Sequence, residues 1–146
     1  MNLYLEQVEE FHVAMDYRQP TPKAPTADVE TIDLRLGLLE EELNELTRAL
    51  TVDFSGVDAL DALCDLQYVL SGAILALGYS QVFDKAFSLV HASNLAKLWT
   101  ADEMAGAPSD LAFQKSPCGE GYIAIRADGK RIKPPSWTPP DLAQFV

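Results

Sequence analysis

Apolar side chains recur at the spacing of an α-helix along four segments of the chain. These segments span approximately residues 3–17, 32–50, 57–77 and 81–98. Such periodicity with short connections is typical of a helical bundle. Gly78 is expected to end the third helix, and Ser80 is expected to cap the amino end of the fourth. The pattern therefore predicts a four-helix bundle.

The remaining segments predict loops and one β-hairpin. The stretch RQPTPKAPTADVET is interpreted as a linker, TVDFSG separates the second and third helices, and residues 100–120 are interpreted as an irregular loop. Two short strand-like runs flank Asp128-Gly129, which is a hairpin signal, and a proline-rich tail with room for one helical turn follows. We therefore expect a single all-α domain over residues 1–146. Its helical core would end near residue 98, and a loop, β-hairpin and tail would fill residues 99–146.

Glutamates lie among the leucines of the second helix. At about 100° per residue, Glu42 and Glu45 fall inside the leucine arc and Glu41 falls at its edge. Glu40 falls on the opposite, solvated side. An inward carboxylate without a compensating cation would cost several kcal/mol. The required cation is either Arg35, which falls in the same arc, or a bound metal ion.

A stripe of aspartates follows the third helix, which is otherwise apolar almost all round. Asp58, Asp61 and Asp65 fall within a sector about 60° wide, and Tyr68 continues this stripe toward the carboxyl end. The apolar character predicts a helix that is buried on most faces. Like charges at this spacing repel, so a buried helix keeps them only opposite positive charge. An exposed polar edge is the alternative, and it suits Asp58 better than Asp65.

Two helices with inward carboxylates, packed antiparallel, would form a cluster of oxygen ligands. Mg²⁺ and Mn²⁺ prefer such ligands. A ferritin-like di-iron site needs Glu-x-x-His on two helices, but this sequence has one, from Glu9 to His12, and its other histidine is His91. Oxidase chemistry is therefore disfavoured, and His12 is interpreted as a polar residue at the edge of the core.

The fourth helix carries polar groups at the end of an apolar face. Phe83, Phe87 and Val90 share this face, and Asn94 and Lys97 follow on it. An amide and an ammonium there could meet phosphate oxygens or a base. The alternative is that Lys97 extends to water and Asn94 caps the helix. Spacing alone favours neither interpretation.

The charge balance narrows the classes of partner. The chain has 22 acidic and 11 basic residues among 146, a net charge of −11. This excess argues against a nucleic-acid partner, although clustered carboxylates can hold cations that then bind phosphates. Five basic residues lie close together near the carboxyl end: Lys115, Arg126, Lys130, Arg131 and Lys133.

The sequence predicts a soluble, cytoplasmic protein with no membrane partner. No apolar run approaches the roughly 18 residues of a membrane span, and the acidic start MNLYLEQVEEF does not resemble a signal peptide. Cys64 and Cys118 make no disulfide framework and fit a reducing cytosol. Cys64 lies in an apolar helix and is interpreted as a core residue.

Four motifs, in this order, resemble the MazG-like, all-α NTP pyrophosphohydrolase superfamily. They are LLEEELNEL, DALDALCDLQYVLSGAILALG, VFDKAFSLVHASNLAK and DGKRIKPPSWTPPDL. That group includes phosphoribosyl-ATP pyrophosphohydrolases and dimeric dUTPases. The resemblance covers about residues 8–98 and 126–142 and is nearest to small MazG-like proteins of bacteria and phages. The ordered set is specific, whereas each motif alone is a weak signal.

The resemblance implies metal ligands at matched positions. Three residues match the EExxE motif of the family: Glu41, Glu42 and Glu45. Asp65 matches the end of the ExxD motif, but the Glu of that motif falls on Ala62, which is a departure. Asp61 lies on the same stripe and could substitute in part. The number of metal sites is therefore left open.

The implied reaction is hydrolysis of a nucleoside triphosphate between its α and β phosphates. Glu42, Glu45 and Asp65 would hold Mg²⁺ or Mn²⁺, two or more ions, with Asp61 as an auxiliary ligand. Glu41 would orient or deprotonate the attacking water, and Lys97 would stabilise charge on the phosphates. The residues expected to contact the substrate are Tyr68, Asn94, Lys97, Lys130, Lys133 and Trp137. Tyr68, Trp99 or Trp137 could stack on the base, although packing of the tail on the bundle is the simpler role for Trp137.

The substrate and the assembly are also implied by the resemblance. The segment after SNxxK and the later GKxxKPxxW are similar to phage MazG-like enzymes that act on purine deoxynucleotides, including the (d)GTP-specific MazZ group. A dGTP or GTP substrate is therefore favoured, with dUTP or dCTP as the alternative, and a phage-encoded protein would act in the host cytoplasm. A homodimer or homotetramer is implied. The competing hypothesis is a non-catalytic helical module whose acidic stripes mediate assembly.

Overall fold

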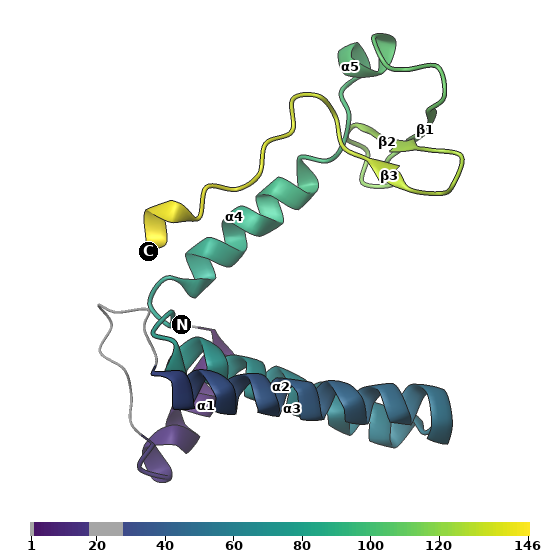
Figure 1. Cartoon of the computed structure of the whole chain (residues 1–146). Helices are drawn as coiled ribbons and strands as arrows, with labels where there is room; N and C mark the ends of the chain where they lie inside the picture. The colour runs from purple at the N-terminus through teal and green to yellow at the C-terminus, as the bar shows by residue number, and fades with distance from the viewer. Residues whose placement is uncertain (1, 18–27) are drawn as a thin grey trace. The chain divides into compact units, whose positions relative to one another are not determined.

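The computed structural model describes residues 2–17 and 28–146 (Figure 1). It is mostly helical, with one small antiparallel sheet toward the carboxyl end, so the predicted fold class is confirmed. The chain separates into two compact units, the first ending at Asp84 and the second spanning Lys85–Val146. The prediction of a single domain stays a prediction. Most of the predicted linker falls on residues 18–27, outside the described residues.

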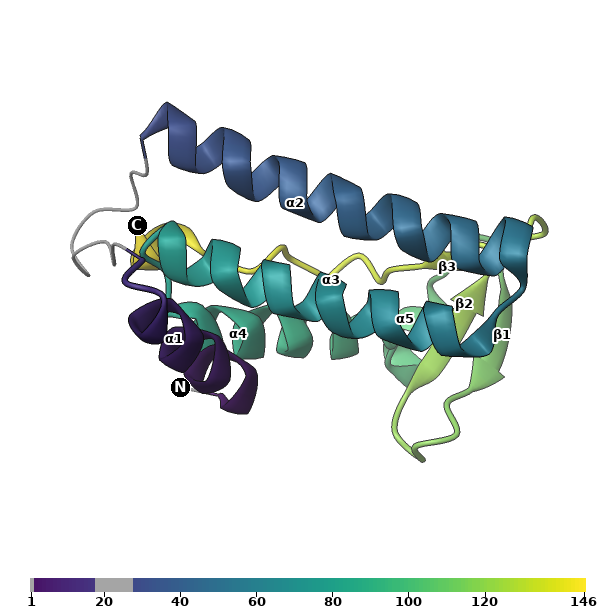
Figure 2. The same ribbon diagram turned by 90° about the horizontal axis from the view of Figure 1, so that it is seen from below.

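The described residues of the first unit form three helices, and a tight π-helical turn joins the second helix to the third. They are α1 (Leu3–Ala14), α2 (Val29–Arg48) and α3 (Gly56–Ala76), with the turn η1 at Ala49–Asp53. Asn2, Asp28 and Ser55 cap the amino ends of the helices by accepting a hydrogen bond from a first-turn amide. The α2 and α3 helices lie side by side and antiparallel in both views (Figures 1 and 2).

The buried core of this unit lies where α1 meets the carboxyl-terminal half of α3. Leu5 and Val8 of α1 pack with Ile74 and Leu75 of α3, and Tyr79 and Phe83 pack against them. The helical pattern of α1 is confirmed at these positions. His12 is also buried, as its interpretation as a core-edge residue requires, whereas Met15 lies beyond the end of the helix and is exposed.

The amino-terminal half of α3 is more exposed than its sequence predicts. Val57, Leu60 and Leu63 are 79%, 64% and 50% exposed, because the core with α1 forms at the other end of the helix. The prediction that α3 is buried on most faces is therefore wrong within one chain. Cys64 is exposed too, which corrects its interpretation as a core residue.

The α3 helix is long and apolar enough to cross a membrane, judged by length and composition alone. This finding corrects the expectation that no segment approaches the length of a membrane span. That expectation considered only uninterrupted apolar runs, whereas α3 is apolar on average over its length. Core helices of soluble proteins pass the same test, and 44% of the relevant window is buried within the protein. The length of α3 is therefore weak grounds for a membrane location.

The second unit contains most of α4 and a small sheet. Its elements are α4 (Phe83–Leu95), α5 (Ala101–Ala105), β1 (Ala112–Lys115), β2 (Tyr122–Ile125), β3 (Arg131–Ile132) and the 3₁₀ turn η2 (Ala143–Phe145). The strands pair antiparallel in the order β1-β2-β3, so the predicted hairpin around Asp128-Gly129 is confirmed as β2-β3. The 3₁₀ turn lies in the tail, where one helical turn was expected.

One helix boundary and two short elements differ from the predictions. The α4 helix begins at Phe83 after a turn, so Ser80 is not its cap. The α5 helix lies in the segment predicted to be irregular, where Thr100 and Glu103 form a capping box. The β1 strand lies there too, because it pairs with β2 across the Phe113–Ala124 register.

Trp99 is the central buried side chain of the second unit. It is 2% exposed, its Nε1 donates to the Ile132 carbonyl at 2.7 Å, and its ring meets Phe113 edge-on. Its backbone pairs with Tyr122 in both directions. The indole therefore ties the end of α4 to all three strands, and it is not accessible for stacking on a base.

Candidate functional site

A cluster of carboxylates forms between α2 and α3. Burial raises the pKa of Glu42, and the negative charges of Asp65, Glu45, Glu41 and Asp61 raise it further, in that order. These are the five residues that the sequence predicts as metal ligands and base. Because the interactions reach Glu42 from both helices, antiparallel packing has brought the two acidic motifs together.

The exposure of these side chains differs from the prediction for Glu45. Glu42 is half-buried, whereas Glu45, Asp61 and Asp65 are exposed to solvent in the single chain. The inward orientation predicted for Glu42 agrees with its partial burial, the burial predicted for Glu45 is wrong, and the exposure of Asp61 and Asp65 in the single chain favours the alternative of an exposed polar edge. Ala62, where the family motif has Glu, is buried. Asp61 beside it interacts electrostatically with Glu42 instead.

Arg35 does not supply the cation that Glu42 needs. Its guanidinium lies at the other end of the helix pair, where Nη1 would be 2.8 Å from a Cβ built on Gly72. Burial lowers the pKa of His12, and the nearby Arg35 charge lowers it further. Arg35 lies two helical turns, about 10 Å, before Glu42 along α2. The structure therefore disfavours the ion-pair alternative and leaves the carboxylate cluster without a described basic partner.

The chemistry of the donor set fits a hard divalent cation. Five carboxylates supply only oxygen, and the like-charge repulsion at Glu42 is the imbalance that a cation would relieve. Within residues 2–17 and 28–146, no three His, Cys, Asp or Glu side chains converge closely enough to hold an ion. The carboxylates therefore form an electrostatic group around Glu42 and not a preformed ligand shell.

Asn94 and Lys97 meet each other near the end of α4. Lys97 Nζ donates to Asn94 Oδ1 at 2.7 Å, and both residues are exposed. Lys97 is exposed, as the alternative of an extension to water expects, and it also bonds to Asn94, so both interpretations stay open. The pair presents an ammonium and an amide N–H₂ on one surface, as a phosphate-binding role would require.

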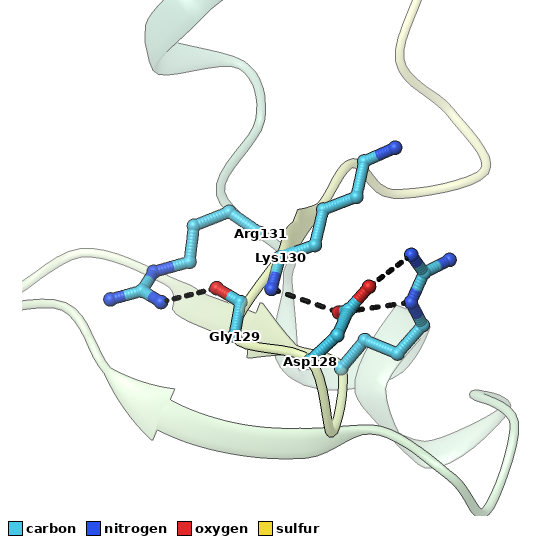
Figure 3. Close-up of polar contacts among 5 residues, drawn as sticks. Asp128, Gly129, Lys130 and Arg131 are labelled. Carbon is cyan, nitrogen blue, oxygen red and sulfur yellow. Dashed lines mark hydrogen bonds and ion pairs between the residues drawn. The ribbon is translucent and has the colours of Figure 1, made fainter.

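The basic segment of the second unit forms the tight turn between β2 and β3. Asp128 accepts hydrogen bonds from the Arg126 side chain and from the Lys130 amide, and Arg131 Nη1 donates to the Gly129 carbonyl (Figure 3). The hydrogen bonds from the Arg126 side chain and the Lys130 amide, with a smaller effect of the Arg126 charge, lower the pKa of Asp128 to about 2. Gly129 has φ +82°, which favours glycine in this turn. Figure 3 shows the Lys130 side chain directed away from the turn.

The candidate stacking aromatics differ in what already covers them. Trp137 donates from Nε1 to the Ser93 carbonyl of α4 at 2.8 Å, and Lys133 Nζ lies 3.6 Å from its ring centroid. Both features place Trp137 in a packing role. Tyr68 is 40% exposed and meets Phe11 edge-on, so one of its surfaces is open.

Sequence reasoning missed a group of uncharged polar residues on α3. Gln67 and Ser71 line a pocket against α1, together with Gln7 and Cys64. They fall about 160° and 120° around the helix from Asp65, on the side of α3 that meets α1. The signal in the sequence is that Gln67 and Ser71 are uncharged polar residues within an otherwise apolar helix.

The all-α fold with its antiparallel α2 and α3 agrees with that of a MazG-like pyrophosphohydrolase, and the family match shows the class. The family profile of phosphoribosyl-ATP pyrophosphohydrolase matches residues 8–94, more than half of the chain. The chain belongs to this family, which is a family of nucleotide pyrophosphohydrolases and therefore of hydrolases. The match includes the acidic cluster and Asn94 but neither Lys97 nor the basic turn. The comparison with curated proteins gave no match.

Glu42→Gln is expected to stabilise the metal-free protein at pH 7. The folded-state pKa of Glu42 is raised, so the native state binds its proton more tightly than the unfolded state does. The contribution of Glu42 to the free energy of unfolding is therefore greatest at low pH and falls as the pH rises toward its folded pKa. The amide removes the repulsion, and we expect Tm to rise by about 2–4 °C.

Addition of Mn²⁺ should reverse this order of stability. The cation stabilises the wild-type protein by binding its native state, and it should raise the Tm of Glu42→Gln much less. Thermal scans with EDTA and with Mn²⁺ measure both effects, and Glu40→Gln is the matched control on the solvated side of α2. A lower Tm for metal-free Glu42→Gln, or an equal Mn²⁺ effect in both proteins, would contradict the interpretation of the cluster.

Proposed function

We propose that the protein is a divalent-metal-dependent hydrolase that cleaves nucleoside triphosphates between the α and β phosphates. The observation that carries the proposal is the electrostatic grouping of Glu42 with four other carboxylates from two helices. Membership in a pyrophosphohydrolase family supports the reaction class. The products would be a nucleoside monophosphate and pyrophosphate.

The carboxylates would have separate roles in this reaction. Glu42, Glu45 and Asp65 would hold two or more Mg²⁺ or Mn²⁺ ions, and Asp61 would assist in place of the missing motif glutamate. When bound, the cations would offset the triphosphate charge and lower the pKa of water. Glu41 is exposed beside Glu42 and would orient the attacking water and accept its proton.

Basic and amide groups of the second unit would bind the phosphates. Lys97 would exchange its bond to Asn94 for phosphate oxygens and stabilise charge that develops there, and the freed Asn94 amide would add a further contact. Lys130 and Lys133 would contribute long-range attraction for the anionic substrate. Lys133 would have to leave the Trp137 ring to contact a phosphate directly.

The proposed substrate is a purine nucleoside triphosphate, with dGTP or GTP favoured. The family takes its name from phosphoribosyl-ATP, a purine nucleotide, which supports a purine over the alternatives dUTP and dCTP. Tyr68, the most open of the three candidate aromatics, would lie against the base. The resemblance to phage MazG-like enzymes that act on purine deoxynucleotides supports the same substrate.

The exposed leucines of the first unit support self-association. Leu34, Leu36 and Leu43 of α2 and Leu50 of η1 are each more than half exposed, and Val57 and Leu60 of α3 add to the apolar surface. Monomeric soluble proteins rarely leave so many large apolar side chains in water on neighbouring helices. We propose a homodimer or homotetramer that acts in the cytoplasm.

A panel of common ribo- and deoxyribonucleoside triphosphates tests the proposed function. Each is incubated with the full chain and Mg²⁺ or Mn²⁺, and pyrophosphate is measured. We expect the fastest release from dGTP or GTP and none in EDTA. An absence of pyrophosphate from every nucleotide, with the protein folded and associated, would instead support the non-catalytic assembly module. Preferential cleavage of dUTP or dCTP would retain the reaction and replace the substrate.

A further inference from the structure

A cation with incomplete hydrogen bonding lies where α1, α2 and α3 meet. The Arg35 guanidinium of α2 lies against Gly72 of α3, where Nη1 would be 2.8 Å from a Cβ on the glycine, and Nε2 of His12 would be 3.4 Å from the same point. Within the described residues, Arg35 Nε is the only buried side-chain nitrogen or oxygen that has no hydrogen-bond partner. None of the ion pairs between described residues includes Arg35. An unpaired buried donor is costly, so an acceptor from a ligand would stabilise this site.

Four aromatic rings lie beside this cation. The buried His12 ring meets Tyr17 edge-on, with 5.4 Å between the ring centroids. The Phe11 ring meets Tyr17 and Tyr68 edge-on at 5.9 and 5.7 Å, and these three rings are 39%, 48% and 40% exposed. We call the four rings together with Arg35 the Arg35 cluster. Open aromatic surface beside a cation is suited to a flat, aromatic ligand.

The Arg35 cluster carries a single positive charge at pH 7. Burial lowers the pKa of His12, and the Arg35 charge lowers it further, so the imidazole is neutral. Arg35 stays protonated and offers only donors. One charge among aromatic rings is a poor match for a triphosphate, which carries several negative charges. The N–H groups of Arg35 suit instead the acceptor atoms of a neutral nucleobase.

The Arg35 cluster and the acidic cluster lie on the same sides of α2 and α3. Glu42 follows Arg35 by seven residues on α2, and Gly72 follows Asp65 by seven residues on α3. Residues at this spacing differ by only about 20° around a helix and by about 10 Å along it. Because the helices run antiparallel (Figure 2), Arg35 meets Gly72 about two turns from the level where Glu42 interacts with Asp65. A nucleotide spans a comparable distance from its phosphates to the far edge of its base.

We propose that the Arg35 cluster receives the nucleobase of the substrate, with the Arg35 guanidinium donating to O6 and N7 of guanine. The proposal rests on the proposed function. Guanine presents these two acceptors side by side, and arginine binds them in pairs wherever proteins read guanine in DNA. Adenine replaces O6 by a 6-amino donor, which would face the guanidinium donors, and the pyrimidines lack N7. Arg35 thereby selects guanine, while Tyr68 and Phe11 lie against the base.

Base analogues test which atoms Arg35 reads. The full chain is titrated by isothermal calorimetry in EDTA with dGMP, dIMP, 7-deaza-dGMP and dAMP. We expect dGMP and dIMP to bind with similar affinity, because both present O6 and N7. Loss of one acceptor in 7-deaza-dGMP, or its replacement by a donor in dAMP, should weaken binding about tenfold.

Variants separate base recognition from folding. Arg35→Gln should bind dGMP no more tightly than dAMP, whereas Arg48→Gln, at an exposed arginine of the same helix, should keep the wild-type preference. Gly72→Ala adds a Cβ 2.8 Å from Arg35 Nη1, so it displaces the guanidinium without removing its charge. It should weaken dGMP binding about tenfold and leave dAMP binding unchanged. Thermal scans of each variant show whether it is folded.

Equal affinity of the wild-type chain for dGMP and dAMP, or no binding of either, would overturn the proposal. A preference for dGMP that persists in folded Arg35→Gln would also overturn it. The titration needs neither metal nor turnover, so its failure is distinguishable from that of the proposed function. Pyrophosphate release together with equal affinities would contradict the base site alone. Selective dGMP binding without pyrophosphate release would support the base site and contradict the hydrolysis.

Discussion

Glu42→Gln and Asp65→Asn are each expected to lower kcat/KM for dGTP by about 100-fold or more. Each substitution removes a proposed cation ligand while keeping nearly the same shape, and loss of charge stabilisation at a phosphoryl site typically has effects of this size. The two carboxylates come from different helices, and each contributes to the same electrostatic grouping. Initial rates of pyrophosphate release at several dGTP and Mn²⁺ concentrations measure the change.

Glu40→Gln is the matched control, because Glu40 is exposed and lies outside the arc of the leucines. It should keep nearly wild-type activity. Excess Mn²⁺ should restore part of the Asp65→Asn activity if that variant binds the cation more weakly. Wild-type rates in Glu42→Gln and Asp65→Asn would show that the carboxylate cluster does not perform the reaction.

Trp99→Ala is expected to lower the free energy of unfolding of the second unit by about 3–5 kcal/mol. The substitution removes an almost fully buried indole, its hydrogen bond to Ile132 and its edge contact with Phe113. It leaves a cavity at the point where the end of α4 meets the sheet. Hydrogen exchange of the β1–β3 amides measures the loss directly, because it resolves the two units.

Trp99→Phe keeps an aromatic ring and should lose less stability than Trp99→Ala. Trp137 remains in both variants as a fluorescent probe of α4, since its Nε1 bonds to Ser93. A change below 1 kcal/mol in Trp99→Ala would contradict the central role of this side chain. It would indicate that the sheet and α4 are held together by other contacts.

Helical periodicity was sufficient to predict the principal acidic residues of the site. It separated Glu40 from Glu42 within one run of glutamates, and it placed Asp61 and Asp65 on one stripe. It could not decide between Arg35 and a metal as the balancing cation, because that choice depends on what faces α2 in three dimensions. The structure argues against Arg35 by placing it near Gly72 and His12, and the metal stays a prediction.

The sequence was less informative about burial and short elements. Apolar residues such as Leu60 predict burial, but their pattern does not say whether the chain's own core provides it, and Leu60 is exposed in the single chain. The four-residue strand β1 depends on its pairing with β2 and has no alternating pattern to reveal it. The cap of α5 was visible as the spacing of Thr100 and Glu103.

Phosphorus NMR of the products of dGTP hydrolysis with Mn²⁺ tests the central claim most directly. Cleavage between the α and β phosphates predicts equal amounts of dGMP and pyrophosphate from the wild-type chain, with neither formed in EDTA or by Glu42→Gln. The appearance of dGDP and orthophosphate would contradict the assigned bond. An unchanged dGTP spectrum, together with unchanged spectra for the other nucleoside triphosphates, would contradict the proposed activity itself.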